Sequence, residues 1–163
     1  MSYTLIPLDG ERINALILDP VLTLAPLCDN VVAIEEIVSV LSEASLGFYE
    51  AIEAVSPWFS YLVRRDSDRA VVGTCSFKGA PSEGIVEVAY FTFPGYEAQG
   101  CATNMVAGLL LIARRSQDVS YVIAHTLPEE NSSTSVLRRN GFEHLGTVVD
   151  PEDGDVWRWL LTV

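Results

Sequence analysis

A strand, a helix and a second strand follow one another over residues 85–126, and this order limits the folds open to the chain. Residues 85–93 are apolar on both faces of a strand pattern and are ended by Pro94-Gly95. Residues 102–115 then place apolar side chains at helical spacing, and residues 119–126 return to a strand pattern. A helix that joins two strands is a crossover connection, so the sequence predicts an α/β or α+β domain.

The rest of the chain predicts further elements of the same two kinds. Strands are expected at residues 4–8, 58–65, 70–77, 142–149 and 155–162, and helices at residues 12–18, 31–45, 48–55 and 132–139. Residues 20–30 are ambiguous. No repeat, low-complexity tract or change in composition divides the chain. We therefore expect one domain over residues 1–163.

The charge balance narrows the range of partners. The chain carries 10 Lys and Arg against 22 Asp and Glu, a formal net charge of −12. Nucleic-acid binding relies on clustered cations, so we do not expect nucleic acid as a partner. No apolar run reaches the ~18 residues of a membrane span. Residues 1–9 lack the pattern of a secretory signal, so no membrane association is expected either.

The residues that bind metals or form disulfides are few and widely spaced: Cys28, Cys75, Cys101, His125 and His144. Three cysteines at such spacing form neither a disulfide framework nor a zinc-binding pattern. We therefore expect no metal, and a reducing, cytoplasmic compartment.

The loop between the strand at residues 85–93 and the following helix has small residues at alternate positions, Ala98, Gly100 and Ala102. Small side chains let a ligand approach the backbone, where the first N–H groups and the positive end of the helix dipole face it. That arrangement suits a phosphate. The alternative is a tight turn that needs glycine for its geometry alone.

A second polar loop, residues 126–131, leads into the helix expected at residues 132–139, which Asn140-Gly141 ends. Asn131 directly precedes this helix. Its side chain can cap the first turn, offer its amide to a ligand, or do both.

Together these segments resemble the GNAT superfamily of acyl-CoA N-acetyltransferases. The match is closest to the branch similar to the ribosomal-protein N-terminal (alanine) acetyltransferases. Residues 97–103 (EAQGCAT) match its Gln/Arg-x-x-Gly-x-Gly/Ala loop, and residues 126–142 match its Thr-Leu-Pro-Glu…Asn-x-Ser…Val-Leu…Gly-Phe signature. Residues 150–159 are similar to its closing hairpin. The resemblance covers residues 58–163 well, and the N-terminal third only in the placing of its helices.

The resemblance implies a single GNAT-like domain. Its sheet would be twisted, mixed and mostly antiparallel, with six to seven strands, about four flanking helices, and a splay between the fourth and fifth strands. Acetyl-CoA, the implied co-substrate, would lie in that opening, with its pantetheine arm along residues 86–92 and Asn131 facing the arm or holding the wall around it. The implied cofactor-binding residues are Val88, Ala89, Tyr90, Gln99, Gly100, Cys101, Ala102, Thr103 and Asn131.

Two residues are candidates for the chemistry of acetyl transfer to an amine. An ammonium group must lose a proton before it attacks a thioester, so the reaction needs a general base. Glu87 is the one charged residue of the apolar strand, and a glutamate on this strand often has that role in the family. The alternative is a structural or substrate-orienting role. His125, at the end of the fifth strand, is the second candidate base or a substrate contact, against a strand-end histidine outside the chemistry.

The general acid is not readable from the family pattern. Many members carry a tyrosine where Leu137 stands, and that tyrosine reprotonates the leaving thiolate. Here Tyr90, a water or no acid takes this part.

The phosphate loop also departs from the family. Glu97 stands where members usually carry Arg or Gln, so the loop gains a negative charge. Two basic pairs, Arg114-Arg115 and Arg138-Arg139, either supply a cation instead or face solvent at helix ends.

The sequence predicts an acetyl-CoA-dependent N-acetyltransferase acting on a primary amine of a protein N-terminus or small molecule. The alternative is a catalytically degenerate GNAT-fold module that binds acyl-CoA or a partner without turnover. The fold suggests a homodimer.

Overall fold

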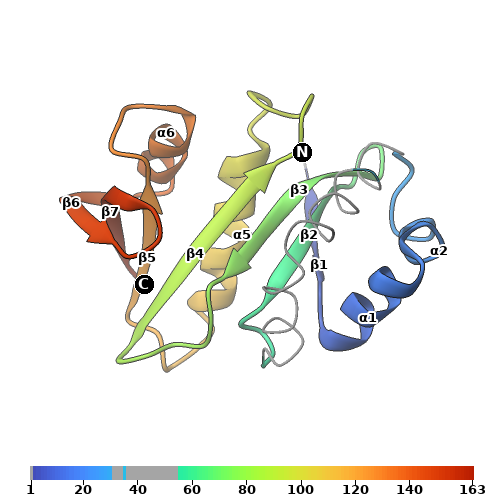
Figure 1. The fold of residues 1–163 in the computed structure, drawn as a ribbon, viewed down its shortest axis with the longest axis horizontal. Helices are drawn as coiled ribbons and strands as arrows, with labels where there is room; N and C mark the ends of the chain where they lie inside the picture. The colour runs from blue at the N-terminus through green and yellow to red at the C-terminus, as the bar shows by residue number, and fades with distance from the viewer. Residues whose placement is uncertain (1, 31–34, 36–54) are drawn as a thin grey trace.

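The computed structural model describes residues 2–30, 35 and 55–163. Seven strands form one sheet in the order β1-β2-β3-β4-β5-β7-β6 (Figure 1). The strands are β1 (Tyr3–Pro7), β2 (Ser60–Arg65), β3 (Ala70–Phe77), β4 (Ile85–Thr92), β5 (Tyr121–Thr126), β6 (Glu143–Asp150) and β7 (Gly154–Thr162). β4 and β5 pair in parallel, whereas the other neighbouring pairs are antiparallel. The predicted mixed, mostly antiparallel sheet is confirmed.

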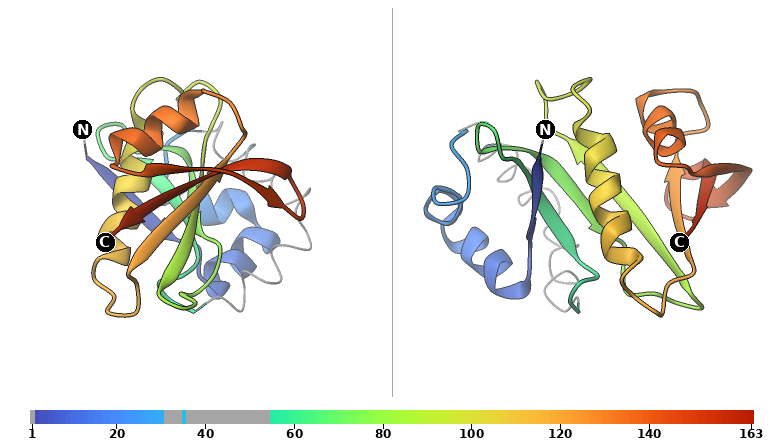
Figure 2. Two further views of the ribbon diagram at one scale, coloured as in Figure 1. Left: turned by 90° about the vertical axis from the view of Figure 1, so that its left-hand side faces the viewer. Right: turned by 180° about the vertical axis from the view of Figure 1, so that it is seen from behind.

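Four helices of the described part cover the two faces of this sheet. They are α1 (Gly10–Leu18), α2 (Pro20–Leu24), α5 (Cys101–Ala113) and α6 (Ser132–Arg139). Figure 2 shows α5 and α6 on one face and α1 and α2 on the other. Aspartates begin the two short helices, because the Asp9 carboxylate accepts from the Arg12 N–H and the Asp19 carboxylate accepts from the Leu22 N–H.

Each face buries its own apolar core. Under α5, the helix residues Met105 and Leu109 pack with strand residues that include Val72 and Trp159. A smaller core under α1 and α2 includes Ile13, Leu16, Leu62 and Phe93. Both cores exclude water from the sheet, and burial of this kind stabilises the fold by about 25 cal/mol per Å² of apolar surface.

One glycine allows β3, β4 and α5 to lie so close together. A Cβ built on Gly73 would lie 2.2 Å from the Phe91 carbonyl oxygen and 2.6 Å from the Met105 Cε. Any side chain at this position would therefore push β3 away from β4, and the tip of Met105 on α5 would also have to move; β4 and α5 carry the site described below.

The predicted elements lie close to the observed ones. The helix at residues 132–139 and the strand at residues 70–77 have the expected bounds, and the ambiguous stretch 20–30 begins with α2. The helices expected at residues 31–45 and 48–55 lie, apart from Glu35 and Val55, outside the described residues. Among the helices described, none is long and apolar enough to cross a membrane.

The face of β4 opposite α5 remains open to solvent in the described part of the chain. Ile85 and Phe91 are 38% and 51% exposed on this face, and Glu87 and Ala89 lie between them.

Candidate active site

The loop before α5 is shaped by two residues with left-handed backbone. Ala98 and Gly100 have φ angles of 58° and 79°, and Gly100 caps α5 without a side-chain hydrogen bond. The first backbone N–H groups of α5 therefore have no partner within the helix. The helix dipole places partial positive charge at the same end. This helix end is suited to an anion such as phosphate.

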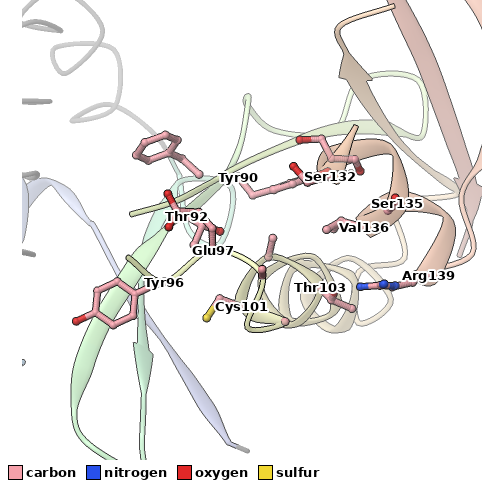
Figure 3. A pocket seen from close by; sticks show the side chains of 15 residues that line it. Tyr90, Thr92, Tyr96, Glu97, Cys101, Thr103, Ser132, Ser135, Val136 and Arg139 are labelled. Atoms are coloured by element: carbon pink, nitrogen blue, oxygen red, sulfur yellow. Dashed lines mark hydrogen bonds between the residues drawn. The ribbon is translucent and has the colours of Figure 1, made fainter. Parts of the chain in front are cut away.

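A cavity of about 550 Å³ lies in front of this helix end (Figure 3). We call it the α5 cavity. It is bounded by the end of β4, the loop and first turn of α5, and one side of α6. The lining residues are Tyr90, Phe91, Thr92, Tyr96, Glu97, Ala98, Gly100, Cys101, Ala102, Thr103, Ser132, Ser133, Ser135, Val136 and Arg139.

Two charged side chains of opposite sign line the α5 cavity. Glu97 is exposed, and its carboxylate accepts a hydrogen bond from the Gly95 N–H at 2.6 Å. Arg139 lines the cavity from α6, and Figure 3 shows its guanidinium extending toward Thr103. Arg139, which is itself exposed, is therefore the cation among the residues that line this cavity.

The other basic residues considered from the sequence do not reach this cavity. Arg138 donates two hydrogen bonds to the Glu130 carboxylate, at 2.5 and 2.6 Å, and lowers the pKa of Glu130 to about 2. Arg114 and Arg115 follow the last residue of α5, at the far end from the cavity.

Gln99 faces away from the α5 cavity. Its side-chain oxygen accepts from Arg65 at 2.8 Å, and its side-chain nitrogen donates to the Gly95 carbonyl at 2.9 Å. Arg65 also pairs with Asp68 at 2.7 Å and lies over the Tyr96 ring. Gln99 therefore holds the loop to the β2–β3 hairpin.

The splay between β4 and β5 begins after three paired residues. Ile85, Val86 and Glu87 pair with residues 121–123, and beyond Glu87 no pairing of the two strands continues. The Glu87 carbonyl accepts from the Lys78 N–H, so it points toward β3. Because backbone direction alternates along a strand, the backbone groups of Val88 and Tyr90 turn toward the gap beside β5.

A second cavity, of about 260 Å³, lies in this gap. We call it the splay cavity. It is lined by Val88, Ala89, Tyr90, His125, Thr126, Leu127, Asn131 and Ser133. Tyr90 and Ser133 line both cavities, so the two adjoin.

His125 is held in the splay cavity by hydrogen bonds to both ring nitrogens. Its Nδ1 lies 2.9 Å from the Glu87 Oε1, and its Nε2 lies 3.0 Å from the Nε–H of Arg158. Since an arginine can only donate, Nε2 accepts and Nδ1 carries the proton, which it donates to Glu87. The two contacts therefore fix one tautomer of the ring, with the Nδ1 hydrogen facing Glu87.

Glu87 has a second partner, Lys78, whose ammonium lies 2.9 Å from the same Oε1. This hydrogen bond to Glu87 raises the pKa of Lys78. The four side chains Lys78, Glu87, His125 and Arg158 therefore form a continuous chain of hydrogen bonds across three strands and the end of β3.

Tyr90 connects β4 to α6 across the splay. Its hydroxyl donates to the Ser133 carbonyl at 3.0 Å, and burial raises the pKa of Tyr90 to about 12. The phenol thus keeps its proton well above neutral pH. Leu137, at the position of the family's tyrosine, is fully buried in the core.

Asn131 has the capping role considered from the sequence and also lines the splay cavity. Its side-chain oxygen accepts from the Thr134 N–H at 3.1 Å, while its own N–H donates to the Thr134 hydroxyl at 3.1 Å. This capping box fixes the first turn of α6 against the cavity wall.

The structure thus brings most of the predicted site residues to two adjoining cavities. Gly100, Cys101, Ala102 and Thr103 line the α5 cavity, Val88, Ala89, His125 and Asn131 line the splay cavity, and Tyr90 lines both. Glu87 and Gln99 line neither cavity. Glu87 contacts Lys78 and His125, and Gln99 contacts Arg65. Arg158 and Lys78 were not predicted from the sequence as site residues. Arg158 reaches His125 through the strand order: β7, not β6, pairs with β5 and sets Arg158 opposite His125.

Comparison with known families agrees with this geometry. Residues 30–143 match the acetyltransferase (GNAT) domain family. The chain therefore belongs to the GNAT acetyltransferase family. Comparison of the sequence with curated proteins gives no significant match.

Solved structures share the fold at low sequence identity. An acetyltransferase from Salmonella typhimurium that modifies the N-terminal serine of ribosomal protein L7/L12 aligns with 100% of this chain and 96% of its own, at 18% identity and a TM-score of 0.64. RimL, a ribosomal L7/L12 N-acetyltransferase solved with coenzyme A, aligns over 100% and 95%, at 17% identity and a TM-score of 0.64. A GNAT acetyltransferase from Bacillus anthracis aligns over 63% of this chain and 65% of its own, at 19% identity and a TM-score of 0.57.

Proposed function

We propose that this protein transfers an acetyl group from acetyl-CoA directly to a primary amine. The observation that carries the proposal is that the anion-binding end of α5 and the hydrogen-bonded His125 open into adjoining cavities, joined at Tyr90 and Ser133. One cavity has the donors for a pyrophosphate, and the other has a proton acceptor beside the gap between β4 and β5.

The residues present fit acetyl-CoA. The N–H groups at the start of α5 would hold the pyrophosphate, and Arg139 would add a cation on the α6 side. The backbone N–H groups of Val88 and Tyr90 face the gap, where they would polarise a carbonyl oxygen. When bound, acetyl-CoA supplies the activated acyl group as a thioester.

We assign proton transfer to His125 and a positioning role to Glu87. His125 lines the cavity, whereas Glu87 contacts the far side of the ring. His125 would take the proton of the incoming ammonium on Nε2. Glu87 would hold the ring in place and stabilise the imidazolium that forms, because a carboxylate within hydrogen-bonding distance favours a nearby positive charge.

The protonated ring is also a better proton donor to the leaving thiolate than Tyr90. A thiol of ordinary pKa, about 8.5, would have to take a proton from a phenol whose pKa is about 12, which is unfavourable by several pKa units. Tyr90 is better placed as a tether between β4 and α6.

The acceptor amine is that of a protein N-terminus or a small molecule, and a cytoplasmic location and a homodimer stay predictions. The test incubates the protein with acetyl-CoA and a panel of primary amines, and records thiol release together with N-acetylated product by mass spectrometry. One product molecule per thiol released supports direct transfer. Binding of acetyl-CoA without product from any amine would instead support the degenerate module.

A further inference from the structure

Arg158 is a cation that has no ionic partner among the residues that the structure describes, in a strongly acidic protein. Within residues 2–30, 35 and 55–163, no carboxylate lies within 4.0 Å of its guanidinium, and its Nε–H donates to the His125 Nε2. The chain as a whole has 22 acidic residues against 10 basic ones. A guanidinium in such a chain readily finds a carboxylate, so one without such a partner in the described part, in contact with a residue that lines the splay cavity, needs an explanation.

Two carboxylates that interact with Lys78 and His125, those of Glu87 and Asp150, have other partners than Arg158. Glu87 pairs with Lys78 and accepts from His125 through the same oxygen. Asp150 accepts from the backbone N–H groups of Glu152 and Asp153, and these bonds lower the pKa of Asp150. The guanidinium of Arg158 thus keeps donors available for an anion from outside the protein.

The contact with Arg158 also conflicts with the proton transfer assigned to His125. The Arg158 Nε–H occupies the Nε2 lone pair, which is the atom that must take the proton. A protonated ring would in addition have a positive guanidinium 3.0 Å away, and like charges at that distance repel. Both obstacles disappear when an anion draws Arg158 away from Nε2 and neutralises it.

We propose that the acceptor is a free α-amino acid whose carboxylate binds Arg158; the proposal rests on the acetyltransferase function above. The carboxylate takes the guanidinium in a charge-assisted, bidentate contact. The ammonium group on the same carbon then replaces Arg158 as the donor to His125 Nε2. One proton passes from the ammonium nitrogen to Nε2, which leaves a neutral amine and an imidazolium bonded to Glu87.

The geometry favours an amine and a carboxylate that are close together in the acceptor. Nε2 of His125 and Nε of Arg158 are 3.0 Å apart, and the guanidinium has to move only far enough to break this hydrogen bond, so the two groups of the acceptor that bind them are close together. An α-amino acid has both groups on one carbon. The N-terminus of a peptide has an uncharged amide in place of the carboxylate and cannot neutralise Arg158.

The test compares each of the common L-amino acids with its amide, which differs only in the carboxylate. Binding is measured as the rise in Tm in the presence of saturating coenzyme A, and turnover as kcat/KM with acetyl-CoA. We expect at least one amino acid to be preferred over its amide by about tenfold to a hundredfold, the usual effect of a hydrogen bond between charged groups. Intrinsic reactivity favours the amide, whose amine loses its proton more readily.

Two variants make the result specific to Arg158. Arg158→Gln keeps a hydrogen-bond donor but removes the charge, and it should abolish most of the preference in both readouts. Arg115→Gln removes an exposed arginine at the far end of α5 and should leave the preference intact. The same protocol is applied to a short peptide with a free N-terminus.

The outcomes separate this inference from the function on which it rests. Arg158-dependent binding of an amino acid with no acetylated product would keep the carboxylate site and overturn the acetyltransferase function. Acetylation that prefers amides or the peptide, or a preference that survives in Arg158→Gln, overturns the inference and keeps the enzyme. The absence of both binding and acetylation of every amino acid overturns the inference as well.

Discussion

The two adjoining cavities differ in the groups that they offer to a ligand: one offers mainly backbone groups, the other side chains. The α5 cavity offers mainly backbone donors, presented by a loop with left-handed residues at 98 and 100. The splay cavity depends on side chains, with His125 held by Glu87 and Arg158. A site made of backbone donors does not depend on the identity of the side chains, so the proposed phosphate site is compatible with Glu97 in its loop. A side-chain network does, so the proposed chemistry depends on a few residues around the splay.

The largest effect is expected at His125. His125→Gln removes the proton acceptor, and general-base help is typically worth ~10²–10⁴-fold, so kcat/KM should fall by that factor near neutral pH. The deficit should shrink at high pH, where the amine is already deprotonated. A pH–rate profile measures both. His144→Gln is the matched control, since His144 packs on Trp157 and Trp159 outside both cavities. A normal rate for His125→Gln at neutral pH would assign the proton to another acceptor.

A smaller, but still large, effect is expected at Gly100. A β-branched residue at a φ of 79° strains the loop by ~1–3 kcal/mol, which corresponds to a loss of about tenfold to a hundredfold in acetyl-CoA affinity when binding needs this geometry. Gly100→Val tests it by calorimetry. The open space around Gly100 shows that the strain, not a clash within the protein, is the reason.

Gly154→Val is the control for Gly100→Val. Gly154 has a φ of 74°, also without close neighbours, but it lies in the β6–β7 turn far from the α5 cavity. It should lower Tm by a similar amount and keep full acetyl-CoA affinity. Equal loss of affinity in both variants would mean that general destabilisation, rather than the loop, explains the result.

A fall in kcat of about tenfold is expected for a substitution of Glu87, because Glu87 acts through His125. Glu87→Gln keeps an acceptor for the His125 Nδ1–H but removes the charge that stabilises the imidazolium. We expect kcat to fall while the KM for acetyl-CoA stays unchanged, and the deficit to shrink at high pH as in His125→Gln. A merely structural role would lower activity equally at all pH values. Lys78→Gln, which removes the other partner of Glu87, completes the comparison.

The smallest effect is expected at Glu97. Glu97→Gln retains an acceptor for the Gly95 N–H and removes one exposed negative charge from the α5 cavity. Exposed charges contribute up to about 1 kcal/mol, so acetyl-CoA should bind up to about fivefold more tightly at low salt. The gain should vanish as salt is added, because screening acts within ~10 Å at 0.1 M. A gain that is independent of salt would point to a change of loop conformation instead.

The sequence predicted the fold more completely than the site. Periodicity and turn residues located α6 and β3 at their observed bounds, and the splay followed from the resemblance of residues 97–103 and 126–142. Local signals of this kind are carried by neighbouring residues, so they survive without knowledge of the tertiary structure.

The part of the site that was missed depends on long-range pairing. Glu87 and His125 are 38 positions apart, and His125 and Arg158 are 33 apart. Their contacts need the parallel register of β4 and β5 and the insertion of β7 between β5 and β6, neither of which leaves a mark in local sequence. The sequence likewise contains several arginines that were candidates for the cation of the α5 cavity. Only the packing of α6 against α5 distinguishes Arg139, which lines it, from Arg138, which pairs with Glu130.

The most direct test of the division between backbone binding and side-chain chemistry is a calorimetric titration of acetyl-CoA into His125→Gln, beside the wild-type protein. We expect both proteins to bind acetyl-CoA with the same affinity, within about a factor of two, although the variant has lost most of its turnover. Loss of binding in His125→Gln comparable to that of Gly100→Val would contradict the division, and the absence of binding to the wild-type protein at millimolar acetyl-CoA would contradict the proposed function itself.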